Sequence, residues 1–124
     1  MFNLTFFLSK PKIKAKITSR ILNELPKDGI LVEGLIAYPI AYQTSRKRVI
    51  VIPHEPDKLL AIQQTNLSIN KFNLHYAVFS DLYKTELHLG YPAIEYIKSF
   101  KLLKEIKEDN DTYYIYEIPT YISD

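Results

Sequence analysis

The chain has 124 residues, of which 47% are hydrophobic and 24% are charged, and this composition is typical of one globular domain spanning residues 1–124. It contains no cysteine, which excludes disulfides, thiolate metal sites and a cysteine nucleophile, and which favours a cytoplasmic protein. No apolar run approaches the roughly 20 residues that span a bilayer, so we expect no membrane partner.

The formal net charge of +2 is unevenly distributed along the chain. Residues 1–62 carry ten Lys and Arg against five Asp and Glu, a net charge of +5. Residues 63–124 carry six against nine, a net charge of −3. Such an asymmetry concerns surfaces and partners rather than the fold, and it directs attention to the first half of the chain.

The first elements in chain order are a strand and a helix. Residues 2–8 are rich in Phe and Leu and predict a buried strand. Ser9 fits a helix N-cap, and Pro11 fits the first turn, where its missing N–H costs nothing. A helix is predicted over residues 10–25, with lysines on one face. Its apolar face is predicted to consist of every fourth residue, namely Ile13, Ile17, Ile21 and Leu25.

The next segment predicts two strands joined by a turn. Residues 30–42 predict a long strand whose second half lies at a sheet edge or is bent, because Pro39 cannot donate to a ladder. Residues 43–46 predict a hairpin connection. Residues 47–53, with the sequence Lys-Arg-Val-Ile-Val-Ile-Pro, predict the clearest strand of the chain.

The second half predicts further helices and strands. A short helix is expected over residues 57–65, a strand over 68–79 and another short strand over 84–89. Apolar residues spaced three and four apart predict a helix over 90–108, and a final strand follows at 112–118.

Element order through residue 79 is therefore β-α-β-β-α-β. This order predicts an α+β domain of the ferredoxin-like kind, a mainly antiparallel sheet with helices packed on one face, followed by a C-terminal helix and strand. The alternative is a winged-helix arrangement, in which the last helix and the strand 112–118 form the helix and the wing.

The clearest functional pattern is the basic one. At 100° per residue, Lys12, Lys16 and Arg20 share a face of the first helix. We expect binding of RNA or DNA, because phosphate contacts need an unneutralised cluster of cations. The candidate site comprises cations of this helix and of the turn between the two strands: Lys12, Lys14, Lys16, Arg20, Arg46, Lys47 and Arg48. The alternative is that these lysines are simply the solvated face of the helix.

Ten tyrosines accompany this pattern. Tyr38 and Tyr42 lie on one predicted strand, and exposed aromatic rings can stack on nucleic-acid bases. Packing within the sheet is the competing explanation for the tyrosines. A second function class is a protein-interaction or inhibitor module, homodimeric in one version, in which a strand edge near Pro39 pairs with a partner.

Signs of catalysis are few. Glu86 and His88 stand two residues apart, and with Tyr91 or Tyr96 they make a metal-dependent nuclease the third hypothesis. A metal site needs three or four ligands, and only two have a defined spacing here. No phosphate-binding glycine loop, nucleophile elbow or zinc-protease motif occurs. We therefore predict no catalytic residue, no metal and no cofactor.

Overall fold

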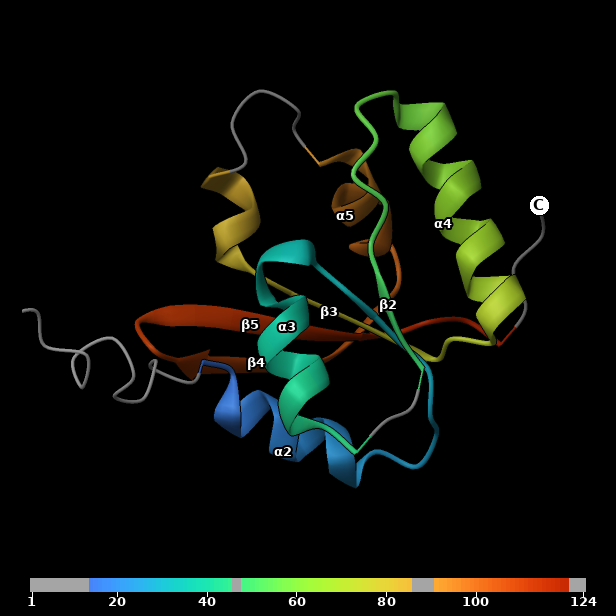
Figure 1. Cartoon of the computed structure of the whole chain (residues 1–124). Coiled ribbons are helices and arrows are strands. Elements are labelled where there is room, and N and C mark those ends of the chain that lie inside the picture. Colours follow the sequence, from blue (N-terminus) through green and yellow to red (C-terminus); the bar gives the residue numbers. More distant parts are fainter. Residues whose placement is uncertain (1–13, 46–47, 86–90, 121–124) are drawn as a thin grey trace, which may run out of the picture.

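The computed structural model describes residues 14–45, 48–85 and 91–120 (Figure 1). The strand expected at 2–8, the cations Lys12, Arg46 and Lys47, and the pair Glu86 and His88 lie outside these residues. The elements in chain order are α2 (Lys16–Glu24), β1 (Ile30–Val32), α3 (Gly34–Gln43), β2 (Val49–Val51), α4 (Lys58–Phe72), β3 (Tyr76–Ser80), the 3-10 helix η1 (Asp81–Thr85), α5 (Pro92–Ile97), β4 (Lys101–Glu108) and β5 (Asp111–Glu117).

The strands form one mixed sheet in the order β2-β1-β3-β5-β4. Strand β1 pairs in parallel with both β2 and β3, whereas β5 pairs antiparallel with β3 and β4. Helix α3 connects β1 to β2, and α4 connects β2 to β3 on the other side of β1. Because parallel crossovers are right-handed, the two connections place α3 and α4 on opposite faces of the sheet. Figure 1 shows α2 beside α3, and α5 toward α4.

Two hydrophobic cores follow from this layering. In β1, Ile30 and Val32 point into the core under α2 and α3, whereas Leu31 points into the core under α4 and α5. All three side chains are fully buried, as expected for a central parallel strand. The described residues thus form a single small α+β domain, as predicted. The prediction that all helices lie on one face of a mainly antiparallel sheet is wrong. The described elements show neither the ferredoxin-like nor the winged-helix order.

The long strand predicted at 30–42 is wrong, because the chain turns into α3 after three strand residues. Helix α3 is apolar on nearly every side, so it lacks the periodicity that separates a helix from a strand. Pro39 lies inside the helix, where it removes one backbone hydrogen bond without ending it. The predicted hairpin at 43–46 is also wrong, since the strands it would join are parallel.

Two further boundaries differ from the prediction. Helix α4 runs to Phe72 rather than residue 65, with Asp57 capping its start by accepting a hydrogen bond from the Leu60 N–H. The helix predicted at 90–108 ends at Ile97, and after a turn strand β4 occupies residues 101–108. Asp109 and Asn110 both have positive φ, 57° and 61°, which makes the two-residue turn of a β4–β5 hairpin. The strands predicted at 47–53 and 112–118 are confirmed in β2 and β5.

Candidate nucleic-acid interface

Helix α2 is held against the sheet by the turn of the β4–β5 hairpin. The Glu108 carboxylate accepts hydrogen bonds from the backbone N–H of Ile17 (2.9 Å) and Thr18 (3.0 Å) and from the Thr18 hydroxyl (3.1 Å). Asp109 accepts from the backbone N–H of Ala15 at 3.2 Å. These carboxylates satisfy N–H groups that the first helical turn leaves unpaired, and their charge complements the helix dipole.

The face of α2 that packs inward differs from the predicted one. Its buried residues are Thr18, Ser19 and Leu22, and Ala15 before the helix is also buried. Ile17, expected in the core, is 41% exposed. The hydrogen bonds to Glu108 and Asp109 favour this orientation over the one that would bury every isoleucine.

Two contacts define the two flanks of α2. Ile21 and Leu25 line a cavity together with Leu103 of β4, so that flank faces β4. On the other flank, the Asn23 side-chain oxygen accepts from the Thr44 hydroxyl (2.8 Å), just after α3. On a helix with 100° per residue, Lys16 and Arg20 lie only about 20° and 60° around the axis from Asn23. Both cations therefore lie toward the α3 flank.

Lys14 lies just before the N-terminal end of α2. Its carbonyl oxygen accepts a hydrogen bond from the Gln43 side-chain amide at 2.6 Å, and Gln43 is the last residue of α3. The side chains of Lys14, Lys16 and Arg20 are exposed. Within the described part of the chain, no ion pair includes any of the three. The structure thus places three of the seven predicted cations on or just before α2, which contacts the C-terminal end of α3.

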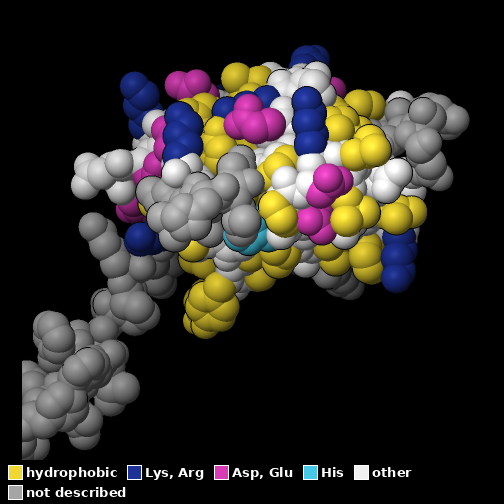
Figure 2. Space-filling model, turned by 90° about the horizontal axis from the view of Figure 1, so that it is seen from above, with side chains coloured by type: hydrophobic (Ala, Val, Ile, Leu, Met, Phe, Trp, Pro, Cys, Tyr) yellow, Lys and Arg dark blue, Asp and Glu magenta, His cyan; other side chains and the backbone are white. Residues whose placement is uncertain are grey.

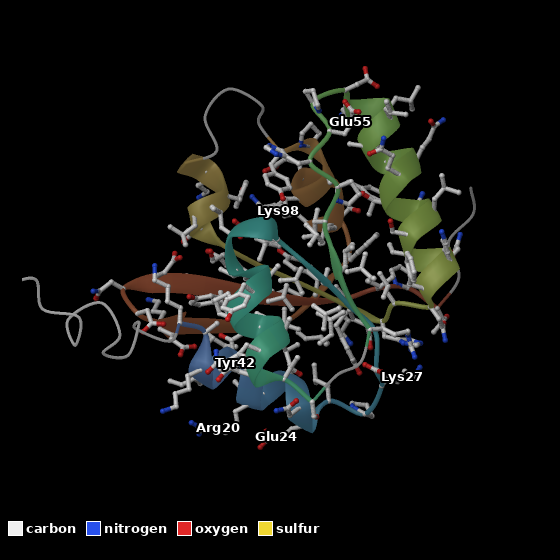
Figure 3. All side chains as sticks on the ribbon, in the orientation of Figure 1. Arg20, Glu24, Lys27, Tyr42, Glu55 and Lys98 are labelled. Atoms are coloured by element: carbon white, nitrogen blue, oxygen red, sulfur yellow. The ribbon has the colours of Figure 1, made fainter. Side chains whose placement is uncertain are left out.

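Helix α3 exposes aromatic rings beside these cations. Tyr38 is 77% exposed and Tyr42 is 71% exposed, and their rings are nearly parallel, with centroids 6.1 Å apart and an interplanar angle of 18°. The helix itself carries no charged residue. Figure 3 shows Arg20 and Tyr42 in the same lower region of the molecule, with Glu24 further along α2. We call the group Lys14, Lys16, Arg20, Tyr38 and Tyr42 the α2–α3 surface.

Arg48 lies elsewhere and is engaged in the structure. Its guanidinium lies 3.6 Å from the Asp28 carboxylate and donates to the Asn73 carbonyl oxygen at 3.3 Å. These contacts tie the start of β2 to the loops before β1 and β3. Because β1 and β2 are parallel, no hairpin tip presents Arg48 as a second cationic site.

The tyrosines of β5, unlike those on α3, pack in the core. On β5, Tyr113 is fully buried, and Tyr114 and Tyr116 pack against Phe79 with ring centroids 5.3 and 5.5 Å away. Burial and a 3.0 Å hydrogen bond to Asp81 raise the pKa of Tyr114 to about 12. Core packing therefore explains the β5 tyrosines. For the tyrosines of α3, the sequence feature that could have indicated a shared side of a helix is the four-residue spacing between Tyr38 and Tyr42.

The histidines form no catalytic cluster in the described residues. His54 stacks on Tyr91 with ring centroids 4.6 Å apart, and the Nδ1 atom of His75 lies 2.7 Å from the Asp28 carbonyl oxygen. Tyr96 donates to the Asn66 side chain. Across residues 14–45, 48–85 and 91–120, no three His, Asp or Glu side chains are grouped as metal ligands.

No protein-family model, curated protein or solved structure matches the chain. Among the described helices, none combines the length and apolarity needed to cross a bilayer.

Proposed function

We propose that the protein binds single-stranded nucleic acid through the α2–α3 surface. The observation that supports this most is that exposed cations on and just before α2, which form no ion pair with the described residues, lie beside two exposed, nearly parallel tyrosine rings on α3. Proteins that bind single strands combine cations that follow the phosphates with aromatic rings that stack on the bases. Both parts are needed, because phosphate contacts alone serve duplex and single strand alike.

In this proposal the phosphates contact cationic side chains on and just before α2 rather than the N-terminal end of the helix. The N-terminal end of a helix attracts anions, but Glu108 and Asp109 already occupy that position in α2. Lys14, Lys16 and Arg20 remain as the phosphate ligands. Three such contacts on a single strand predict a slope of log K against log salt of about −2.

A charge-reversal pair tests this proposal. The K16E/R20E variant should lose most of its affinity for a fluorescently labelled single-stranded oligonucleotide at low salt, measured by anisotropy. The matched control is K58E/K71E, which changes the net charge equally at exposed positions on α4, across the sheet. Absence of wild-type binding at low salt, or an equal loss in both variants, contradicts the proposal.

A second candidate function is self-association through β2. This strand lies at one end of the sheet order, and among the described strands it pairs only with β1. The Arg48 carbonyl oxygen and the Ile52 N–H form backbone hydrogen bonds with β1. Because alternate residues of a strand direct their backbone groups to opposite sides, the N–H and C=O groups of Val49 and Val51 point away from β1. Val51 is also 51% exposed. An unprotected edge of this kind can pair with an identical strand.

The geometry of such a dimer agrees with helix packing. Helix α3 contacts both β1 and β2. Neighbouring strands are about 4.8 Å apart, so pairing of β2 with β2 of a second copy about a two-fold axis would place the axes of the two α3 helices about 10 Å apart. This distance is typical of packed helices. No charge on α3 would oppose this contact. In Figure 2, hydrophobic side chains lie along the lower margin of the molecule, which is the side that faces the reader in Figure 1.

Solution mass tests the second candidate. Light scattering over a concentration series should give a dimer for the wild type and a monomer for Val51→Lys. Leu67→Lys, at a 60% exposed position on α4, should remain dimeric. A wild-type monomer at every concentration rules out the dimer and leaves the nucleic-acid proposal untouched.

A further inference from the structure

Tyr38 and Tyr42 have the arrangement of a clamp for a flat ligand. Each ring projects from a successive turn of α3, and each is more than 70% exposed. Their planes are inclined by only 18°, and the ring centroids are 6.1 Å apart. A ring inserted between two others needs about twice the 3.4 Å stacking distance of nucleic-acid bases, so about 7 Å. The centroids are closer together than this, so the two exposed rings would have to move apart to admit a base.

We propose that Tyr38 and Tyr42 hold one unpaired nucleobase between their rings, an inference that rests on the proposed function. The proposal restricts the ligand to a single-stranded region, because a base within a duplex keeps both faces stacked on its neighbours. It also predicts tolerance of sequence, since every base offers a π-face.

The surroundings of the two rings favour a nucleotide over an uncharged aromatic ligand. Gln43, one residue after Tyr42, holds the Lys14 backbone, and Lys16 and Arg20 lie on the flank of α2 toward α3. A phosphate attached to the clamped base therefore has cations within the same surface. Leu35, one turn before Tyr38 and 48% exposed, extends the apolar wall next to the clamp.

Single tyrosine replacements test the clamp. At fixed salt, Tyr38→Leu and Tyr42→Leu should each weaken oligonucleotide binding roughly 5- to 150-fold, the loss expected for one stacked base. The slope against salt should stay unchanged, because no cation is removed. Tyr38→Phe and Tyr42→Phe keep the ring and should bind like the wild type. Thermal melting of each variant checks that the fold is retained.

A fluorescent base provides a direct readout. An oligonucleotide with a single 2-aminopurine should lose fluorescence on binding the wild type and both Phe variants, and much less on binding either Leu variant. Unchanged affinity and quenching in the Leu variants, with loss of binding in K16E/R20E, contradicts the clamp and leaves the proposed function standing. If the wild type binds no oligonucleotide, both the function and the clamp are wrong.

Discussion

On the α4–α5 side of the sheet, Tyr114 and Tyr116 pack against Phe79, and edge-to-face contacts extend from Phe79 to Tyr83 and from Tyr83 to Tyr91. On the α2–α3 side, Tyr38 and Tyr42 contact each other and are otherwise largely exposed to solvent. Tyr76 and Tyr113 are buried in the core on this side as well, so the contrast lies between tyrosines that pack in a core and the exposed pair on α3.

This difference shows that the abundance of tyrosine is not itself a functional sign. An aromatic ring contributes most to stability when it is buried among other rings. A pair of rings kept at the surface contributes little there and is available for binding. Mutations on the two sides should therefore affect different quantities, namely stability on the α4–α5 side and binding on the α2–α3 side.

The largest effect is expected for Phe79→Ala on the α4–α5 side. Phe79 is fully buried and contacts three tyrosine rings, so its truncation should lower the free energy of unfolding by about 3–5 kcal/mol. Urea denaturation measures this change. The control is Tyr42→Ala, which should change the free energy of unfolding by no more than about 0.5 kcal/mol. Similar losses for the two variants would remove the contrast between the two sides.

An intermediate effect is expected for Glu108→Ala. The substitution removes the carboxylate that accepts three hydrogen bonds at the start of α2, and the loss of such a cap costs about 1–2 kcal/mol. Hydrogen exchange should accelerate at Ile17 and Thr18 before it does so in α4. Glu105→Ala, an exposed position on the same strand, is the control. Unchanged exchange in α2 would mean that the hairpin turn does not hold the helix.

The smallest effect concerns pH. Burial and the hydrogen bond to Asp81 raise the pKa of Tyr114 to about 12, from an ordinary value of 10.0. The folded state thus keeps a proton that the unfolded state loses, so this contribution is present below pH 10 and is lost as the pH rises toward 12. Tyr114→Phe should show a shallower loss of stability over that range, measured by urea denaturation. A loss as steep as in the wild type would contradict the assignment.

Parts of the fold were predictable from local pattern. The alternating or uniformly apolar runs of β2 and β5 predicted strands, and the four-residue spacing in α2 predicted a helix. The segment after β1 was not predictable in this way. Ile30–Val32 and Gly34–Gln43 are both apolar and are separated only by Glu33. Local pattern does not distinguish the strand, which is buried on both faces, from the helix that covers it.

Parts of the candidate site were predictable for a similar reason. Lys14, Lys16 and Arg20 could be recognised from charge alone, because they lie close together in sequence. Their position beside Tyr42 could not, since it depends on how α2 packs against α3. The orientation of α2 depends in turn on Glu108, which is 90 residues from Thr18.

The hydrogen bonds between Glu108 and α2 also bear on how the chain is made. A ribosome adds roughly 5–20 residues per second, so roughly 5–18 s separate the synthesis of Thr18 from that of its acceptor. During this interval α2 emerges with its cations but without the hairpin turn that fixes its orientation. Helix α3 and its tyrosines are complete well before the turn exists. The surface on which both helices lie therefore assembles only after the β4–β5 turn has been synthesised, and a nascent chain that ends before β4 would display its basic residues on an undocked segment.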